Sequence, residues 1–97
     1  MLTKGLLATV VAKEGKEKEV ADFLKNALEL AKKEEKTVDW FAFKMDNETF
    51  GIFDTFESEE GQEAHLNGEI ASKLMENAKD LLRASPNIAK IDILAAK

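Results

Sequence analysis

TVDWFAFKMDNETFGIFDTF, residues 37–56, has the pattern of a β-hairpin. It predicts strands at residues 37–45 and 49–56, joined by a tight turn at 46–48 where Asp and Asn side chains can bond to the backbone. The segment contains the single tryptophan of the chain, Trp40, and five of its six phenylalanines. Large apolar side chains occupy both alternating sets of positions, so we expect both faces of this hairpin to be covered.

The flanking segments extend the hairpin into a β-α-β-β-α-β pattern. The further elements predicted from periodicity and capping residues are a strand at residues 6–12, a helix at 16–35, a short helix from 59 to about 67, a helix at 69–83 and a strand at 88–95. This order is typical of the ferredoxin-like α+β fold, a four-stranded antiparallel sheet with helices on one face. Ninety-seven residues predict one domain, residues 1–97.

Composition excludes several classes of function. The formal charge of −5 does not suit a phosphate backbone, so no nucleic-acid partner is expected. The absence of cysteine excludes disulfides and thiolate zinc sites, and one histidine does not suggest a metal site built from protein ligands. We find no apolar run that could span a bilayer and no signal-peptide pattern, so a soluble cytoplasmic protein without a membrane partner is the expectation.

The two apolar faces of the predicted sheet have a consequence for assembly. Helices cover one face only, and the other would expose a patch of several hundred Å², which is large for a monomer. We therefore predict a homodimer in which two sheets pack face to face. The alternative is that a loop or the C-terminal tail folds over this face, although the chain has little length to spare for it.

Two polar residues are candidates for chemistry. His65 shares one side of the short helix with Gly61 and Ala64, so we expect its imidazole to point inward, where it can move a proton near neutral pH. The alternative is a core histidine bonded to a backbone carbonyl. Asp54 lies in an apolar strand and needs a partner. It either orients His65 or accepts a bond from a neighbouring strand, and Asp92 is a weaker case of the same kind.

Aromatic strand residues are the candidate binding surface. Trp40 and the phenylalanines of the hairpin either line a pocket for a flat organic ligand or belong to the core. The sequence has neither a phosphate-binding glycine loop nor a dinucleotide fingerprint, so we expect no cofactor.

Three stretches resemble the antibiotic biosynthesis monooxygenase family: residues 40–43 (WFAF), 51–56 (GIFDTF) and 63–66 (EAHL). The similarity extends over nearly the whole chain, including residues 91–95. The family has an acidic residue on the third strand, an aromatic residue two positions later and a histidine on the following helix. Asp54, Phe56 and His65 occupy these positions, with Asp replacing the usual Glu and Phe the usual Trp.

The resemblance implies a dimeric α+β barrel with a pocket between each sheet and its helices. It also implies oxidation of a small quinol, phenol or polyketide-like aromatic by dioxygen, without metal or flavin. His65 and Asp54 would then be catalytic, and Trp40, Phe53 and Phe56 would bind the substrate. Haem-degrading relatives use an asparagine on the first strand, which this chain lacks. The alternative function is a non-catalytic dimer that binds a small hydrophobic ligand.

Overall fold

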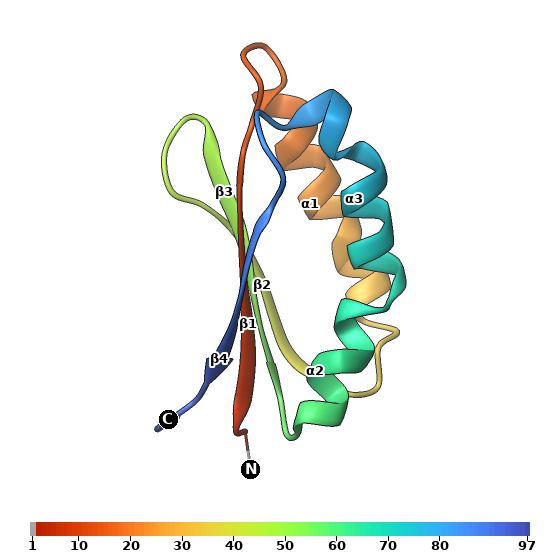
Figure 1. The fold of residues 1–97 in the computed structure, drawn as a ribbon, viewed down its shortest axis with the longest axis vertical. Helices are drawn as coiled ribbons and strands as arrows, with labels where there is room; N and C mark the ends of the chain where they lie inside the picture. The colour runs from red at the N-terminus through yellow and green to blue at the C-terminus, as the bar shows by residue number, and fades with distance from the viewer. Residues whose placement is uncertain (1) are drawn as a thin grey trace.

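The computed structural model describes residues 2–97 as an antiparallel sheet with helices packed on one face (Figure 1). The elements are β1 (Lys4–Val11), α1 (Glu17–Ala31), β2 (Thr37–Lys44), β3 (Thr49–Phe56), α2 (Glu59–Leu66), α3 (Glu69–Leu81) and β4 (Asn87–Asp92). The four strands are ordered β2-β3-β1-β4. The predicted ferredoxin-like class is therefore confirmed. Within residues 2–97, none of the helices has the length and apolar character needed to cross a membrane.

The β2–β3 hairpin forms as its sequence predicts. Asp46 accepts hydrogen bonds at Oδ1 from the backbone N–H groups of Glu48 and Thr49, at 3.0 and 2.8 Å, and these bonds close the turn. The resulting register places Trp40 opposite Asp54. Because successive side chains of a strand point to opposite faces, this register also decides which residues meet the helices.

The core lies between the sheet and the helices. The apolar faces of α1 and α3 pack on alternate residues of β1 and β3. The buried core residues are Val10, Ala12, Val20, Leu24, Ala27, Ala31, Phe50, Ile52, Ile70, Leu74 and Leu82. Full burial of one large aliphatic side chain contributes about 1.5–3 kcal/mol, so this layer supplies most of the hydrophobic stabilisation.

The first helix ends earlier than its charge pattern suggests. It was expected to reach residue 35, but α1 stops at Ala31. The backbone N–H groups of Lys33 and Glu34 bond to the carbonyls three residues before them, each at 3.1 Å, which tightens the last turn. Glu34 therefore leaves the helix surface. The last strand likewise ends at Asp92 rather than residue 95.

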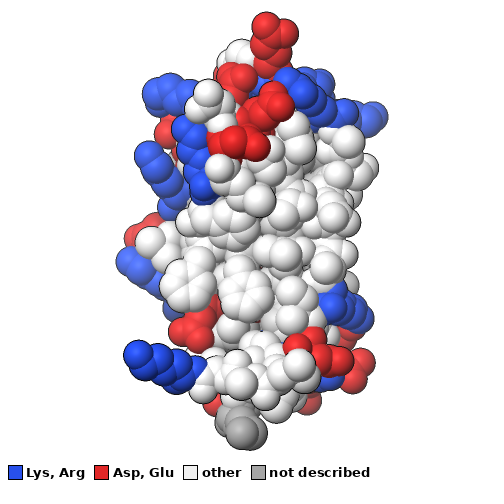
Figure 2. All heavy atoms as spheres, turned by 90° about the vertical axis from the view of Figure 1, so that its left-hand side faces the viewer, with Lys and Arg blue, Asp and Glu red and all other residues white. Residues whose placement is uncertain are grey.

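The face of the sheet opposite the helices is free of charged side chains at its centre, with charged groups toward its periphery (Figure 2). Phe41 is 57 % exposed there. A side chain on Gly51 would meet the ring of Phe43, and one on Gly5 would meet the ring of Phe53. These two aromatic rings thus lie over glycines, close to the sheet. We call this surface, centred on Phe41, Phe43 and Phe53, the open face. Leu94, in the C-terminal tail, is 96 % exposed and so does not pack on this face.

Candidate functional site

Asp54 is a buried acid on the helix side of β3. Its neighbours on that face of the strand are Ile52 and Phe56, and its residue surface is only 1 % exposed. Burying an unpaired carboxylate is costly, so a partner is required. Because side chains alternate along β3, the carboxyl group of Asp54 lies in a layer that is otherwise aliphatic and aromatic.

His65 is held against this acid by α2. Ser58 caps the helix and accepts a 3.4 Å hydrogen bond from the N–H of Gly61. The side chain of Gln62 donates a 2.9 Å bond to the backbone carbonyl of Gly5, which ties α2 to β1. The imidazole of His65 is 8 % exposed and packs at 5.5 Å from the ring of Phe56. The expected inward orientation is confirmed.

The contact between the two groups is short but not aligned. Nε2 of His65 lies 2.8 Å from Oδ2 of Asp54, an ion pair by distance. The geometry is not that of a hydrogen bond, and within residues 2–97 neither carboxylate oxygen of Asp54 has a hydrogen-bond partner. A buried acceptor without an aligned donor is rare in native structures and needs a specific explanation.

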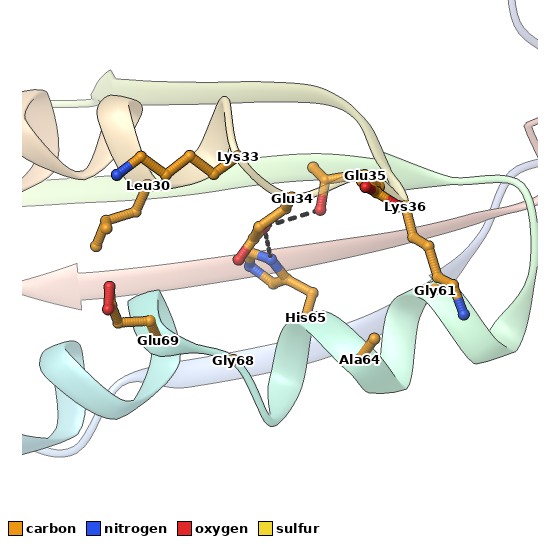
Figure 3. A pocket seen from close by; sticks show the side chains of 11 residues that line it. Leu30, Lys33, Glu34, Glu35, Lys36, Gly61, Ala64, His65, Gly68 and Glu69 are labelled. Carbon is orange, nitrogen blue, oxygen red and sulfur yellow. Dashed lines mark hydrogen bonds and ion pairs between the residues drawn. The ribbon is translucent and has the colours of Figure 1, made fainter.

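A second carboxylate holds the other side of the imidazole ring. Nδ1 of His65 donates to Oε1 of Glu34 at 2.7 Å, and the hydroxyl of Thr37 donates to the same oxygen at 2.9 Å (Figure 3). Glu34 is not evident from the sequence, because a charged residue at the end of a Lys/Glu-rich helix is typical of a solvated face. The ring nitrogens of His65 face two carboxylates and not a backbone carbonyl, so the alternative of a core histidine bonded to the backbone is wrong.

These carboxylates govern the charge of the histidine. Burial by itself lowers the pKa of His65, but the ion pairs with Asp54 and Glu34 outweigh burial and raise its pKa above the ordinary 6.5. His65 is thus favoured as an imidazolium, which donates from both ring nitrogens. It balances the charge of Asp54 in a place that water reaches poorly.

A small cavity opens beside the pair, between the sheet and α2 and α3. This inner cavity has a volume of about 120 Å³ and is lined by Leu6, Ala8, Ile52, Asp54, His65, Leu66, Ile70, Ala71, Leu74, Met75 and Ile88. Its walls are aliphatic apart from the acid and the histidine. Met75 of α3 and Ile88 of β4 both line this cavity. Their side chains are 54 % and 41 % exposed, so the cavity reaches solvent beside them.

A larger depression lies on the other side of the imidazole. This outer groove has a volume of about 410 Å³ and is lined by Leu30, Lys33, Glu34, Glu35, Lys36, Thr37, Gly61, Ala64, His65, Gly68 and Glu69 (Figure 3). It is open to solvent and rich in charge. His65 contributes to the walls of both the inner cavity and the outer groove. One ring therefore separates an apolar interior from an aqueous surface.

The structure brings together some of the candidate residues and separates others. Asp54 and His65 meet, and Phe56 packs on His65. The expectation that Trp40 and Phe53 form the pocket walls needs correction. Phe53 follows the alternation of β3 to the open face, the side opposite Asp54. Trp40 lies on the helix side, packed against the core, and does not line the inner cavity.

Metal ligation has no evident place in this arrangement. Within residues 2–97, no group of three or more histidine and acidic side chains is arranged to hold a metal ion. The exposed Asp92 pairs with Lys4 at 2.6 Å on the rim of the sheet. Proton transfer and binding of an O–H or N–H donor are the chemistry that the Asp54–His65 pair can supply.

Comparison with known proteins gives structural relatives. Neither the protein-family models nor the curated proteins include a match to this chain. A protein of unknown function from Nitrosomonas europaea, NE2512, is 50 % identical, with a TM-score of 0.98 over 100 % of this chain and 94 % of that one. PA3566 from Pseudomonas aeruginosa is 18 % identical, with a TM-score of 0.83 over 98 % and 97 % of the two chains.

A further relative is described as an antibiotic biosynthesis monooxygenase. It is 14 % identical, with a TM-score of 0.80 over 95 % of this chain and 99 % of that one. At this identity the similarity concerns the fold, and it agrees with the resemblance noted in the sequence. The chain therefore belongs to one family with the Nitrosomonas europaea protein NE2512, and its fold is that of the antibiotic biosynthesis monooxygenases.

Proposed function

We propose that this protein is a cofactor-independent oxygenase that oxidises a single-ring quinol or phenol with dioxygen in the inner cavity. One observation carries the proposal. Asp54 is a buried carboxylate with unsatisfied oxygens on the wall of an aliphatic cavity, and His65 stands beside it as the counter-charge. A phenolic hydroxyl is a donor that fits this acceptor, and its ring fits the walls.

The size of the cavity supports a small substrate. An apolar cavity of roughly 150 Å³ in another protein core holds benzene, and the inner cavity measures about 120 Å³. A space of this size takes one small ring at most, and a polycyclic polyketide exceeds it. Of the substrates implied by the family resemblance, single-ring quinols and phenols are therefore the class we propose.

The proposed reaction begins with proton transfer. The substrate O–H breaks, its proton goes to Asp54, and the electron pair stays on the oxygen as a phenolate beside the imidazolium of His65. This electron-rich anion reduces dioxygen. For hydroquinone, one quinol and one dioxygen give one hydroxyquinone and one water, and the substrate supplies all four electrons. One oxygen atom bonds to the ring, and Asp54 returns its proton as the other leaves in water.

Oxygen uptake with a panel of substituted hydroquinones tests the proposal, with anthrone as an oversized member of the panel. We expect uptake above the buffer rate for single-ring substrates, and a loss of about a hundredfold or more in kcat for Asp54→Asn, the range of general acid–base catalysis. Asp92→Asn is the matched control, since it makes the same change at an exposed strand position. Absence of uptake, or full activity in Asp54→Asn, would contradict the proposed function.

A second candidate function is the binding of a small hydrophobic ligand without turnover. The small number of polar side chains that line the inner cavity favours it. Only Asp54 and His65 among its lining residues carry titratable groups. A ligand that binds only the folded state raises the melting temperature, and the rise grows with the logarithm of ligand concentration above its Kd. Such a rise with phenols, together with unchanged phenol and oxygen concentrations over time, would replace the oxygenase by a binding protein.

We also propose that the working unit is a homodimer joined through the open face. Three observations support this assembly. The centre of the face is free of charged side chains, and the charges lie toward the edge (Figure 2). The rings of Phe43 and Phe53 lie over glycines, which keeps the surface flat enough to meet a second sheet. Phe41 projects from it with more than half of its surface exposed. A two-fold axis lets one such patch cover its own copy.

A further inference from the structure

Three ionisable side chains form a line through the layer between the sheet and α2. Asp54 comes from β3, His65 from α2 and Glu34 from the connection between α1 and β2. Nε2 of the imidazole lies 2.8 Å from Asp54, and Nδ1 lies 2.7 Å from Glu34. The inner end of this line lies on the inner cavity, and the outer end lies in the outer groove.

We propose that Glu34 is a positioning residue of the inner-cavity site, which fixes the imidazole of His65 with Nε2 toward Asp54 and keeps the ring cationic. The kinetic part of this inference rests on the proposed function, and the structural part does not. The bond made by one ring nitrogen of a histidine decides the orientation and protonation of the other. Glu34 makes that bond from the side opposite the cavity.

Glu34 is itself held in place through Oε1. Oε1 accepts the hydroxyl proton of Thr37 at 2.9 Å in addition to the imidazole proton. Oε2 lies against Gly68, where an added methyl group would approach it to 3.3 Å. The side chain is 21 % exposed, so the ion pair with His65 is screened less than a surface pair. A carboxylate fixed in this way acts as a support for the ring.

The charge balance explains why a second carboxylate is useful. Within the described residues, His65 is the cationic group in contact with Asp54, whose own oxygens lack hydrogen bonds. A neutral imidazole would leave this buried acid without a counter-charge. Glu34 opposes that loss by favouring the doubly protonated ring. The other charged side chains lining the groove beside His65 are Lys33, Glu35, Lys36 and Glu69, of which Lys36 pairs with Glu60.

The chain offers a direct measurement, because His65 is its single histidine. Histidine labelled with nitrogen-15 in an untagged protein reports the protonation of this one ring as pH is varied. In Glu34→Gln the amide oxygen can still accept from Nδ1, so geometry is retained and only the charge is lost. We expect the midpoint of His65 to fall by about one pH unit or more, which is a tenfold or greater loss of proton affinity.

Two further variants make the result decisive. Glu35→Gln removes the same charge from the neighbouring position in the groove and should leave the midpoint nearly unchanged. Thr37→Val removes the hydroxyl that holds Glu34 without changing any charge, and should lower the midpoint by a smaller amount. If Glu34→Gln does not fold, Thr37→Val still tests whether Glu34 controls the His65 midpoint. An unchanged midpoint in Glu34→Gln, or an equal shift in Glu35→Gln, would overturn the inference.

The pH profile of turnover separates a positioning role from a structural one. Activity that needs cationic His65 falls as pH rises through the His65 midpoint, and in Glu34→Gln this fall should move to lower pH by the same interval. A profile that stays in place while the spectroscopic midpoint moves would refute the positioning role. If no quinol is oxidised by the parent protein, the nitrogen-15 titration still decides whether Glu34 controls the ring, and only the proposed reaction is lost.

Discussion

The two faces of β3 differ in how the polarity of their side chains matches their exposure to water. On the helix side, the carboxyl group of Asp54 is almost fully buried. On the open face, Phe53 and its cross-strand neighbour Phe41 are apolar, and Phe41 is exposed to water. The carboxyl group would be more stable on the solvent-exposed face, and the exposed aromatic ring would be more stable in the core. The polar group is placed where water is scarce, and the apolar rings are placed where water is abundant.

This inversion indicates that each face has a task beyond folding. A buried acid without hydrogen bonds is costly, so it is tolerated where a ligand or a proton needs it. An exposed aromatic surface is costly as well, and is typical of an interface. The helix side therefore serves as the candidate site, and the open face as the candidate dimer surface. The remaining predictions test each side in turn.

The largest effect is expected from Phe41→Lys, which places a charge at the centre of the open face. Burial of an unpaired lysine in a sheet-to-sheet interface should weaken dimerisation by a hundredfold or more, or about 3 kcal/mol, as at interface hot spots. Sedimentation velocity over a concentration series gives the dissociation constant of the dimer. Leu28→Lys is the matched control, since it changes an exposed apolar residue on α1. A parent protein that sediments as a monomer at micromolar concentration would reject the interface.

A smaller effect is expected from Gly51→Ala, which disturbs the flatness of the same face. The added methyl carbon would lie 2.4 Å from the ring of Phe43 and 2.8 Å from the carbonyl oxygen of Ala8, and the backbone cannot withdraw as easily as the ring. We expect a loss of about 1–3 kcal/mol in the free energy of unfolding, typical of overpacking. Urea denaturation measures this loss.

The control for this substitution is Gly61→Ala, where the nearest atoms would lie at 3.3 Å or more and where alanine improves helix propensity. Its stability should stay near that of the parent. If Gly51→Ala is equally harmless, Phe43 is not confined against the sheet and the flat surface that we describe is not a fixed feature.

The smallest effect concerns the helix side and depends on pH. The folded-state pKa of His65 is raised above the ordinary 6.5, so its ion pairs stabilise the fold fully below that value. This contribution is lost as pH rises through the folded-state pKa. His65→Gln should therefore cost more stability at about pH 6 than at about pH 9, and thermal melts at both values measure the difference. An equal cost at both pH values would mean that the histidine is not charged in the fold.

Much of the molecule could be predicted from the sequence. The hairpin at residues 37–56, the order of the elements and the inward position of His65 all follow from local patterns, because turn chemistry and apolar periodicity act over a few residues. Asp54 could be singled out as an acid in an apolar strand. The prediction that Phe53 forms a wall of the same pocket was wrong, because adjacent strand residues point to opposite faces.

Glu34 could not be found in this way. It lies 31 residues before His65, in a segment whose Lys/Glu composition indicates an exposed helix. Only the early end of α1 and the packing of α2 bring its carboxylate to the imidazole. The family resemblance implied a pocket between the sheet and its helices, but the residues that line the inner cavity could not be predicted, because they come from three strands and two helices that only the tertiary structure brings together.

The amino-acid sequence by itself determined the element order, the apolar character of both faces of the sheet and the candidates Asp54 and His65, because these depend on side-chain alternation along single segments. The tertiary structure decided that the histidine is held between two carboxylates, that the cavity has aliphatic walls and that the aromatic rings gather on the open face. These properties depend on register and on the distance between layers, which are set by contacts between residues far apart in the chain.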